Sequence, residues 1–209
     1  MKYKLVYGPE FRAELKKLIG KTRLILGSDS PRRAEILRML DLKFEKIVPE
    51  IDENISVNGG PSSYAERLAI LKAQALRGID AGVIITADTI VVLGNEIINK
   101  PQDENEARRM LDNLSGKTHS VITAVALKDV STGKALYAHS ESRVKFFNLT
   151  SGQVQSYIAG GEPFGKAGAY AIQGAGGDLV ESYEGELDNI IGFPAMLFRD
   201  LFSKLRSEV

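Results

Sequence analysis

The sequence predicts an α/β protein with a mixed β-sheet flanked by helices. Short apolar runs of strand length alternate with segments of helical spacing along most of the 209 residues. Two apparent hairpins, around Gly94-Asn95 and Ser131-Thr132-Gly133, interrupt the strand–helix–strand order of a purely parallel sheet. We therefore expect antiparallel pairs within an α/β sheet, and the long connections between paired strands leave room for a cleft.

Residues 1–21 are expected to form an extension to a main domain that covers residues 22–209. Apolar residues of this extension follow helical spacing, at Phe11, Leu15, Leu18 and Ile19. A short amphipathic helix that docks on the main body is the structure this spacing predicts.

Residues 24–26 predict a short strand, and a helix is expected to follow it. Ser30 is a good helix cap, and Pro31 is favoured at the first helical position. The buried face of this helix is expected to carry Ile36, Leu37 and Leu40.

A second helix is predicted after residue 62. Ser63 and Glu66 have the spacing of a capping box, and Gly78 is the expected stop. Its expected buried face carries Leu68, Leu71 and Ala75.

The rest of the chain continues in the same way. Expected strands cover residues 83–86, 89–93, 96–99, 119–127 and 135–147. Expected helices start at Asp103 and at Thr150, a glycine-rich segment covers 160–177, and an amphipathic helix covers 194–205.

Composition excludes several classes of function. Lys plus Arg and Asp plus Glu each number 27, so no net field attracts the chain to nucleic acid or to an anionic membrane. No cysteine is present, which excludes disulfides and a cysteine nucleophile, and two histidines alone cannot form a zinc triad. Neither a membrane-length apolar run nor a signal-peptide pattern occurs, so a soluble cytoplasmic protein is expected.

The segment Ser28-Asp29-Ser30-Pro31-Arg32-Arg33 is the strongest local feature. Two arginines in a first helical turn oppose the helix dipole, at a cost of about a few tenths of a kcal/mol. An anion held by the free N–H groups, the guanidiniums and the hydroxyls of Ser28 and Ser30 explains the arrangement. The alternative is an exposed helix start whose arginines point to water or to Asp29 and Glu35.

Asp88 interrupts a run of Val, Ile and Thr residues. Burial of an isolated carboxylate is costly unless it is paired or binds a cation. Asp88 is therefore a candidate general base or magnesium ligand, and phosphate chemistry uses both. The alternative is a strand-end aspartate that caps a turn.

Other residues are candidates for the site only in combination with the segment Ser28–Arg33 and Asp88. Lys72 lies close to an apolar helical face and Lys100 precedes Pro101, although each alone suits a solvated lysine. Glu53 alone suits an acidic loop. Glycines between residues 165 and 174 let the backbone approach a flat ligand, and Gln173 has the donor and acceptor to read a base edge. The alternative there is a strand bordered by tight turns.

The chain resembles the Maf family of nucleotide pyrophosphatases from Leu24 to about Phe198. The resemblance is carried by short blocks in order, namely Ser28–Arg33, Ala87-Asp88-Thr89, Asn99-Lys100-Pro101, Gly116-Lys117-Thr118-His119, Gly165–Gly174 and Ile190–Pro194. It implies an elongated mixed sheet with two lobes and a central cleft, similar to inosine triphosphate pyrophosphatases. A homodimer is the assembly it allows.

The resemblance also implies hydrolysis of a nucleoside triphosphate to a monophosphate and pyrophosphate. Asp88 is then the general base, Glu53 and Asp88 hold a divalent cation (Mg²⁺ or Mn²⁺), and Lys100 joins them as catalytic. The implied substrate-binding residues are Ser28, Arg32, Arg33, Lys72, Thr89, Lys166 and Gln173. Among these, Arg32, Thr89 and Gln173 match positions the family uses for substrate choice.

The residue pattern around Gln173 resembles the subgroup that acts on dTTP, UTP and modified pyrimidine nucleotides. Two alternatives stay open, namely a 7-methyl-GTP pyrophosphatase and a non-catalytic nucleotide-binding regulator of cell division. Direct nucleic-acid binding is disfavoured by the balanced charge and by the lack of a basic-aromatic stripe.

Overall fold

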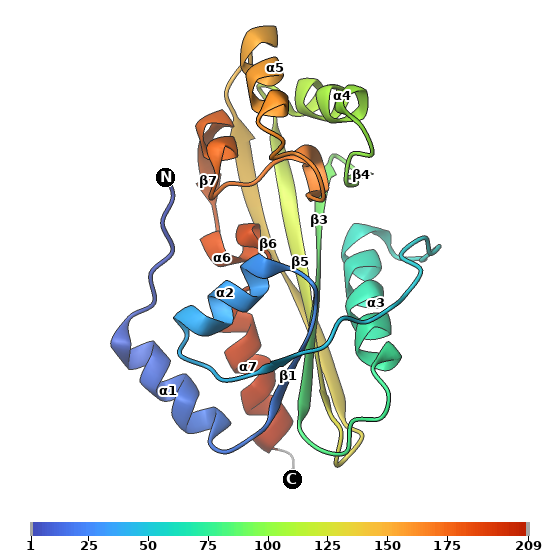
Figure 1. The fold of residues 1–209 in the computed structure, drawn as a ribbon, viewed down its shortest axis with the longest axis vertical. Coiled ribbons are helices and arrows are strands. Elements are labelled where there is room, and N and C mark those ends of the chain that lie inside the picture. The colour runs from blue at the N-terminus through green and yellow to red at the C-terminus, as the bar shows by residue number, and fades with distance from the viewer. Residues whose placement is uncertain (1, 208–209) are drawn as a thin grey trace. The chain divides into compact units, whose positions relative to one another are not determined.

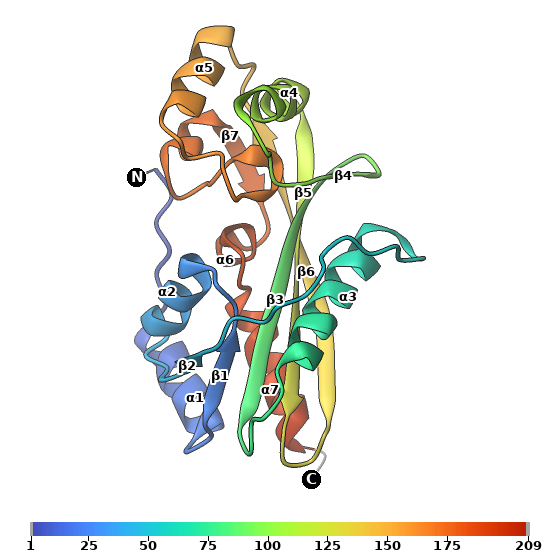
Figure 2. The ribbon, with the colours of Figure 1, turned by 45° about the vertical axis from the view of Figure 1, so that its right-hand side comes forward.

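The computed structural model of the chain describes residues 2–207, and within them seven strands form one mixed sheet. The strand order is β2-β1-β3-β5-β6-β7, and β4 pairs with β3 outside this path (Figures 1 and 2). The strands are β1 (Leu24–Gly27), β2 (Glu45–Lys46), β3 (Val83–Leu93), β4 (Glu96–Ile98), β5 (Thr118–Asp129), β6 (Ala135–Phe146) and β7 (Val180–Glu184). The predicted mixed α/β class is confirmed.

Helices occupy most of the remaining chain. The α-helices are α1 (Pro9–Ile19), α2 (Pro31–Met39), α3 (Gly60–Ala75), α4 (Glu104–Leu114), α5 (Ser151–Ala159), α6 (Leu187–Ile191) and α7 (Ala195–Ser207). Two short 3₁₀ helices, η1 (Ala167–Ala169) and η2 (Ala175–Leu179), lie in the glycine-rich segment. None of the described helices is long and apolar enough to cross a membrane.

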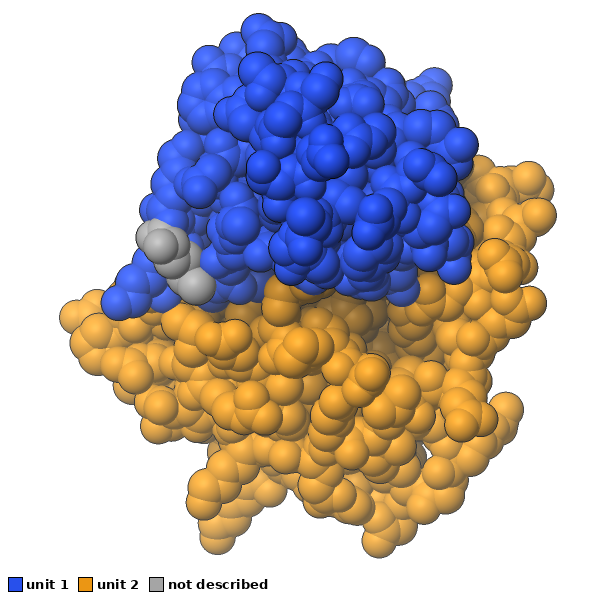
Figure 3. Space-filling view, turned by 45° about the horizontal axis from the view of Figure 1, so that its top comes forward, with its two compact units in different colours: residues 1–5, 89–122, 141–191 blue, residues 6–88, 123–140, 192–209 orange. Residues whose placement is uncertain are grey.

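The chain divides into two compact units, coloured separately in Figure 3. Unit 1 comprises residues 1–5, 89–122 and 141–191, and unit 2 comprises residues 6–88, 123–140 and 192–209. Strands β3, β5 and β6 contribute residues to both units, so Asp88 and Thr89 are neighbours in β3 but belong to different units. The predicted boundary between residues 21 and 22 stays a prediction.

Parallel strands form the base of unit 2. Leu24 of β1 pairs with Val83 of β3, and β2 pairs in parallel with the other edge of β1. Buried Ile25 and Ile84 pack against Ala73 near the end of α3. Because full burial of an isoleucine contributes about 1.5–3 kcal/mol, this cluster fixes α3 on the strand that carries Asp88.

The N-terminal residues include the predicted amphipathic helix. Helix α1 starts with Pro9, buries Leu15 and Ile19, and packs against α7 within unit 2 (Figure 1). The C-terminal helix α7 was also predicted, and its buried face includes Phe198 and Phe202, whose rings are 5.9 Å apart.

The predicted cap of α3 is wrong. The helix begins at Gly60, three residues before Ser63, and Gly59 precedes it with no side-chain cap. Pro61 favours a helix start upstream of Ser63. Ser63 therefore lies inside the first turn, where its Oγ donates to the Gly59 carbonyl. The helix ends at Ala75 rather than near Gly78.

The buried face of α3 also differs from the prediction. Leu68 is buried as expected, but Leu71 and Ala75 are only half-buried, and Lys72 takes a buried position. Lys72 was placed close to the apolar face by the sequence, but a solvated lysine was the expected interpretation, and the structure buries it. The face that packs on the sheet carries Ala65, Leu68, Ala69, Lys72 and Ala73.

Antiparallel pairs characterise unit 1, and the turn at Gly94-Asn95 predicted the first of them. Val91 of β3 pairs with Ile98 of β4, and Arg143 of β6 pairs with Glu184 of β7. Helix α4 packs against α5 and η1. Asp103 caps α4, and Thr150 forms a capping box with Gln153 at the start of α5, both as predicted.

A buried aromatic cluster lies within unit 1. His119 of β5, Phe146 of β6 and Tyr170 make edge-to-face contacts with one another, and Tyr170 Oη lies 2.9 Å from His119 Nε2. Burial lowers the pKa of His119 to about 4 and raises that of Tyr170. Both groups are therefore neutral near pH 7.

Candidate active site

The segment from Ser28 to Arg33 links the end of β1 to the start of α2. Ser30 is the N-cap of α2, and its Oγ accepts the Arg33 N–H at 3.4 Å, with Pro31 at the first helical position. Ser28 Oγ in turn accepts the Ser30 N–H at 3.2 Å. Two serine hydroxyls thus fix the turn that leads into the helix, as the sequence predicted for Ser30.

Arg33 folds back over this turn. Its Nη1 donates to Ser28 Oγ at 3.1 Å, and its Nε donates to the Gly192 carbonyl at 3.0 Å. Asp29 pairs instead with Lys46, at 2.7 Å on the exposed surface. The alternative in which this helix start points its second arginine to Asp29 is therefore wrong. Arg32 is half-buried at the same turn.

Arg33 is a half-buried cation near two carboxylates. Burial lowers the pKa of its guanidinium, Asp88 and Glu53 act in the opposite direction, and Arg32 adds to the lowering. The free-energy cost of moving a guanidinium out of water is smaller when anions lie near it. A phosphate at this turn would supply such an anion.

Asp88 lies inside β3, with only 6% of its surface exposed, so the alternative of a strand-end cap is wrong. Its Oδ1 lies 2.6 Å from Lys72 Nζ, and Lys72 is itself buried. Glu53 Oε1 lies 2.8 Å from the same ammonium group. One lysine therefore holds two carboxylates together, and Lys72 is not the solvated residue that its sequence context alone suggested.

Helix α3 fixes this triad through two hydroxyl contacts that the sequence analysis missed. Thr86 Oγ1, fully buried two residues before Asp88 in β3, donates to the Ala69 carbonyl at 2.6 Å. Tyr64 Oη donates to the Glu53 carbonyl at 2.9 Å. The sequence did contain a signal for the first contact. Thr86 lies two residues from Asp88 and so shares its strand face, and Ala69 lies three residues from Lys72 and so shares its helix face.

The donor set fits a divalent cation only in part. Among residues 2–207 no group of three or more His, Cys, Asp or Glu residues could hold a metal. Glu53 and Asp88, however, already hold one cation, the Lys72 ammonium. Mg²⁺ binds through one or two carboxylates plus waters and substrate phosphates, so this pair suits a metal that arrives with its substrate.

Four predicted site residues belong to unit 1 instead. Thr89 is half-buried in β3, and Lys100 is exposed just after β4. Lys166 precedes η1 and donates to the carbonyls of Glu162 and Phe164. Gln173 is half-buried between η1 and η2. The roles of all the predicted site residues stay predictions.

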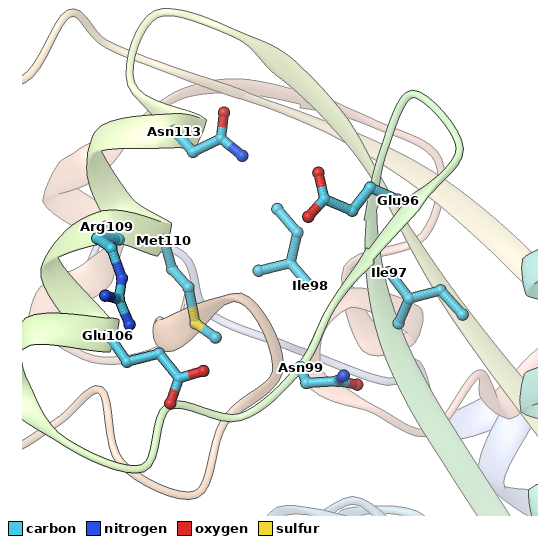
Figure 4. Close-up of a pocket in the computed structure, with 8 residues that line it drawn as sticks. All are labelled: Glu96, Ile97, Ile98, Asn99, Glu106, Arg109, Met110 and Asn113. Atoms are coloured by element: carbon cyan, nitrogen blue, oxygen red, sulfur yellow. The ribbon is translucent and has the colours of Figure 1, made fainter. Parts of the chain in front are cut away.

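A cavity of about 300 Å³ lies in unit 1 between β4 and α4 (Figure 4). Ile98 from β4 and Met110 from α4 extend toward each other, and polar side chains such as Glu96 and Arg109 surround them. None of the predicted site residues lines this cavity.

The mixed α/β fold thus places one cluster of charged side chains in unit 2, formed by Arg33, Glu53, Lys72 and Asp88. A profile of the Maf-like protein family matches residues 23–205, so the chain belongs to that family. The resemblance seen in the short sequence blocks is confirmed.

Relatives of known activity share most of the chain. The chain is 41% identical to the dTTP/UTP pyrophosphatase of Ruminiclostridium cellulolyticum over 188 residues, which cover 89% of this chain and 97% of the relative. It is 45% identical to the dTTP/UTP pyrophosphatase of Symbiobacterium thermophilum, over 82% of this chain and 88% of the relative.

Among solved structures, a HAM1 protein from Coxiella burnetii has a similar fold. The TM-score is 0.51 at 16% sequence identity, and the match covers 90% of this chain and 100% of that protein. At this identity the likeness concerns the fold alone.

Proposed function

We propose that the protein is a nucleoside triphosphate pyrophosphatase that converts dTTP and UTP, and modified pyrimidine nucleotides, to the monophosphate and pyrophosphate. The observation that carries the proposal is that Lys72 holds Asp88 and Glu53 together, within electrostatic range of the half-buried Arg33. The relatives named dTTP/UTP pyrophosphatase support it, because they match over most of their own length.

The start of α2 binds the triphosphate in this proposal. Free N–H groups at a helix N-terminus favour an anion, and the hydroxyl of Ser28 with the guanidiniums of Arg32 and Arg33 adds charge-assisted hydrogen bonds. Arg33 is held by Ser28 and Gly192, so little side-chain entropy is lost when phosphate binds.

Asp88 accepts the proton of the attacking water. The water oxygen bonds to the α-phosphorus as its proton passes to the Asp88 carboxylate, and the bond from that phosphorus to the bridging oxygen breaks. Pyrophosphate leaves with the electron pair. Lys72 orients the carboxylate through Oδ1, at 2.6 Å, and leaves the second oxygen for the water.

Glu53 and Asp88 are also the residues that would hold Mg²⁺ or Mn²⁺. A bound divalent cation neutralises charge that develops on the phosphate oxygens. Glu53 is 43% exposed at its side chain, so it can exchange the lysine contact for a metal contact at small cost.

Four residues of unit 1 also have roles in this proposal. Lys100 and Lys166 add positive charge for the phosphates, and Lys100 is assigned to the catalytic set with Asp88 and Glu53. Thr89 and Gln173 select the base, because Gln173 presents both a donor and an acceptor. We propose that the enzyme is cytoplasmic and can form a homodimer. We also propose that it does not bind nucleic acid directly.

The proposal is tested by measuring pyrophosphate release from a panel of nucleoside triphosphates with Mg²⁺ or Mn²⁺. We expect the highest kcat/KM with dTTP and UTP, and loss of turnover when a chelator removes the metal. Faster turnover of 7-methyl-GTP would overturn the substrate assignment. Tight nucleotide binding without any pyrophosphate release would instead identify a non-catalytic nucleotide-binding regulator.

A further inference from the structure

Glu162, which follows α5, contacts two parts of unit 1 that bind substrate in the proposed function. Its Oε1 accepts the Gly176 N–H and its Oε2 accepts the Ala175 N–H, both at 2.9 Å. Its backbone carbonyl accepts a hydrogen bond from Lys166 Nζ. The residue therefore joins the turn after Gln173 to the lysine expected to hold phosphate.

Tyr157 of α5 contacts the same turn on the side that precedes Gln173. Its hydroxyl donates to Glu162 Oε1 at 2.9 Å and accepts the Ala171 N–H at 3.2 Å. Tyr157 and Glu162 together thus hold backbone groups on both sides of Gln173. The turn itself is closed by the Gly174 N–H, which donates to the Ala171 carbonyl at 3.2 Å.

The backbone of this turn packs closely against the two side chains that hold it. A Cβ at Gly174 would overlap the Glu162 carboxylate, and a Cβ at Gly176 would lie 2.8 Å from the Tyr157 hydroxyl. The missing Cβ at Gly174 lets the backbone approach the Glu162 carboxylate, and the missing Cβ at Gly176 lets it approach the Tyr157 hydroxyl and the Ala171 carbonyl. Gln173 is therefore attached to a turn whose backbone has a fixed place relative to Glu162.

The chemistry of the site favours a carboxylate over an amide. An ionised glutamate accepts hydrogen bonds at both oxygens, and it satisfies two backbone N–H groups and one hydroxyl here. In a glutamine one of the two terminal atoms is a donor, which would face an N–H of the turn. The Glu162→Gln variant therefore loses one contact and gains a repulsive one, with little change in size.

We propose that Glu162 is a positioning residue for base selectivity, which fixes the turn behind Gln173 relative to Lys166. This inference rests on the proposed function, because it takes Gln173 to contact the base and Lys166 the phosphates. Glu162 itself does not touch the substrate. Its effect is transmitted through the two residues that it places.

The test compares Glu162→Gln with the parent in two assays, pyrophosphate release and binding of a dTTP analogue with a non-hydrolysable α,β-methylene bridge. We expect KM for dTTP and the Kd of the analogue to rise about tenfold, as for a polar group left unsatisfied. We expect kcat to stay within about threefold, because Asp88 and Lys72 lie in unit 2. The preference for dTTP over dATP is expected to fall about tenfold.

A double-mutant cycle separates positioning from general loss of structure. In a Gln173→Ala background, Glu162→Gln is expected to have no further effect on the preference for dTTP over dATP. Glu104→Gln is the matched control, because Glu104 is exposed on α4 and outside this network, and it should match the parent in all assays. Tyr157→Phe, which removes one donor to Glu162, is the variant to use if Glu162→Gln fails to fold.

The outcomes distinguish this inference from the proposed function. A parent that turns over dTTP, with an unchanged preference in both Glu162→Gln and Tyr157→Phe, overturns the inference and leaves the function standing. A parent that releases no pyrophosphate overturns the function. In that case weaker and less selective binding of the analogue by Glu162→Gln still supports the positioning role, and unchanged binding refutes it.

Discussion

The two units stabilise their polar groups in different ways. In unit 2, buried charges meet other charges, since Lys72 contacts both Asp88 and Glu53. In unit 1, the buried His119 and Tyr170 are neutral, and the Glu162 carboxylate is satisfied by neutral donors. In the proposed function, the charged cluster of unit 2 suits a triphosphate, which requires opposing charge, and the donor and acceptor of Gln173 in unit 1 suit a base.

Removing the lysine of the buried triad should have the largest effect on stability. Lys72→Met leaves Asp88 buried without its ammonium partner, and loss of one partner of a buried pair costs about 3–5 kcal/mol. The measurement is the free energy of unfolding from urea denaturation.

The matched control is the exposed pair in the same unit. Lys46→Met removes the contact to Asp29, whose side chain is 81% exposed, so the expected cost is below about 1 kcal/mol. Equal losses in the two variants would contradict the claim that unit 2 depends on its buried charges.

The buried, neutral His119 of unit 1 predicts a specific pH dependence. Burial lowers the pKa of His119 to about 4, whereas the unfolded chain binds this proton near pH 6.5. Between these values the unfolded state holds more protons, so stability is present above pH 6.5 and is lost as pH falls to 4. The loss from this group is about 3 kcal/mol.

Replacing the histidine tests this directly. His119→Gln should remove that part of the pH dependence, measured as the free energy of unfolding at pH 7 and at pH 4. Thr118→Gln, at an exposed position of β5, is the control, because it replaces a side chain that does not titrate, and it should keep the parent's slope. A His119→Gln slope equal to that of the parent would show that the aromatic cluster of unit 1 accepts a charge.

The hydroxyl that fixes α3 to β3 should have a smaller effect. Thr86→Val keeps the shape of the side chain but removes the bond to the Ala69 carbonyl, at a cost of about 1 kcal/mol. We also expect kcat to fall, because Lys72 lies one helical turn after Ala69. Thr118→Val, at an exposed position of β5, should change stability by less than about 0.5 kcal/mol.

Much of the fold could be predicted from the sequence, because local signals specify it. The cap at Ser30, the turn at Gly94-Asn95 and the capping box at Thr150 depend on neighbouring residues only. The short strand β2 and helix α6 were missed, since each is too short to show a period. The strand β7 was missed because it is mostly exposed and polar, and only its pairing with β6 reveals it.

The sequence predicted the charged residues of the candidate site, but it did not predict the contacts that hold them in place. Asp88 was recognised because a carboxylate is unusual within an apolar run. The burial of Lys72 was not, since its sequence position fits the edge of a helical face equally well. Glu162 gave no signal at all, because its partners are backbone N–H groups and a hydroxyl, whose placement depends on the folded loop.

The central claim is that Asp88 activates water for attack on a nucleoside triphosphate. It is tested most directly by pyrophosphate release from dTTP by Asp88→Asn, which keeps the size of the side chain and removes the base. Asp112→Asn, at an exposed position of α4, is the matched control. The account predicts a fall in kcat of about 10²- to 10⁴-fold for Asp88→Asn and none for the control. An Asp88→Asn variant as active as the parent would contradict it.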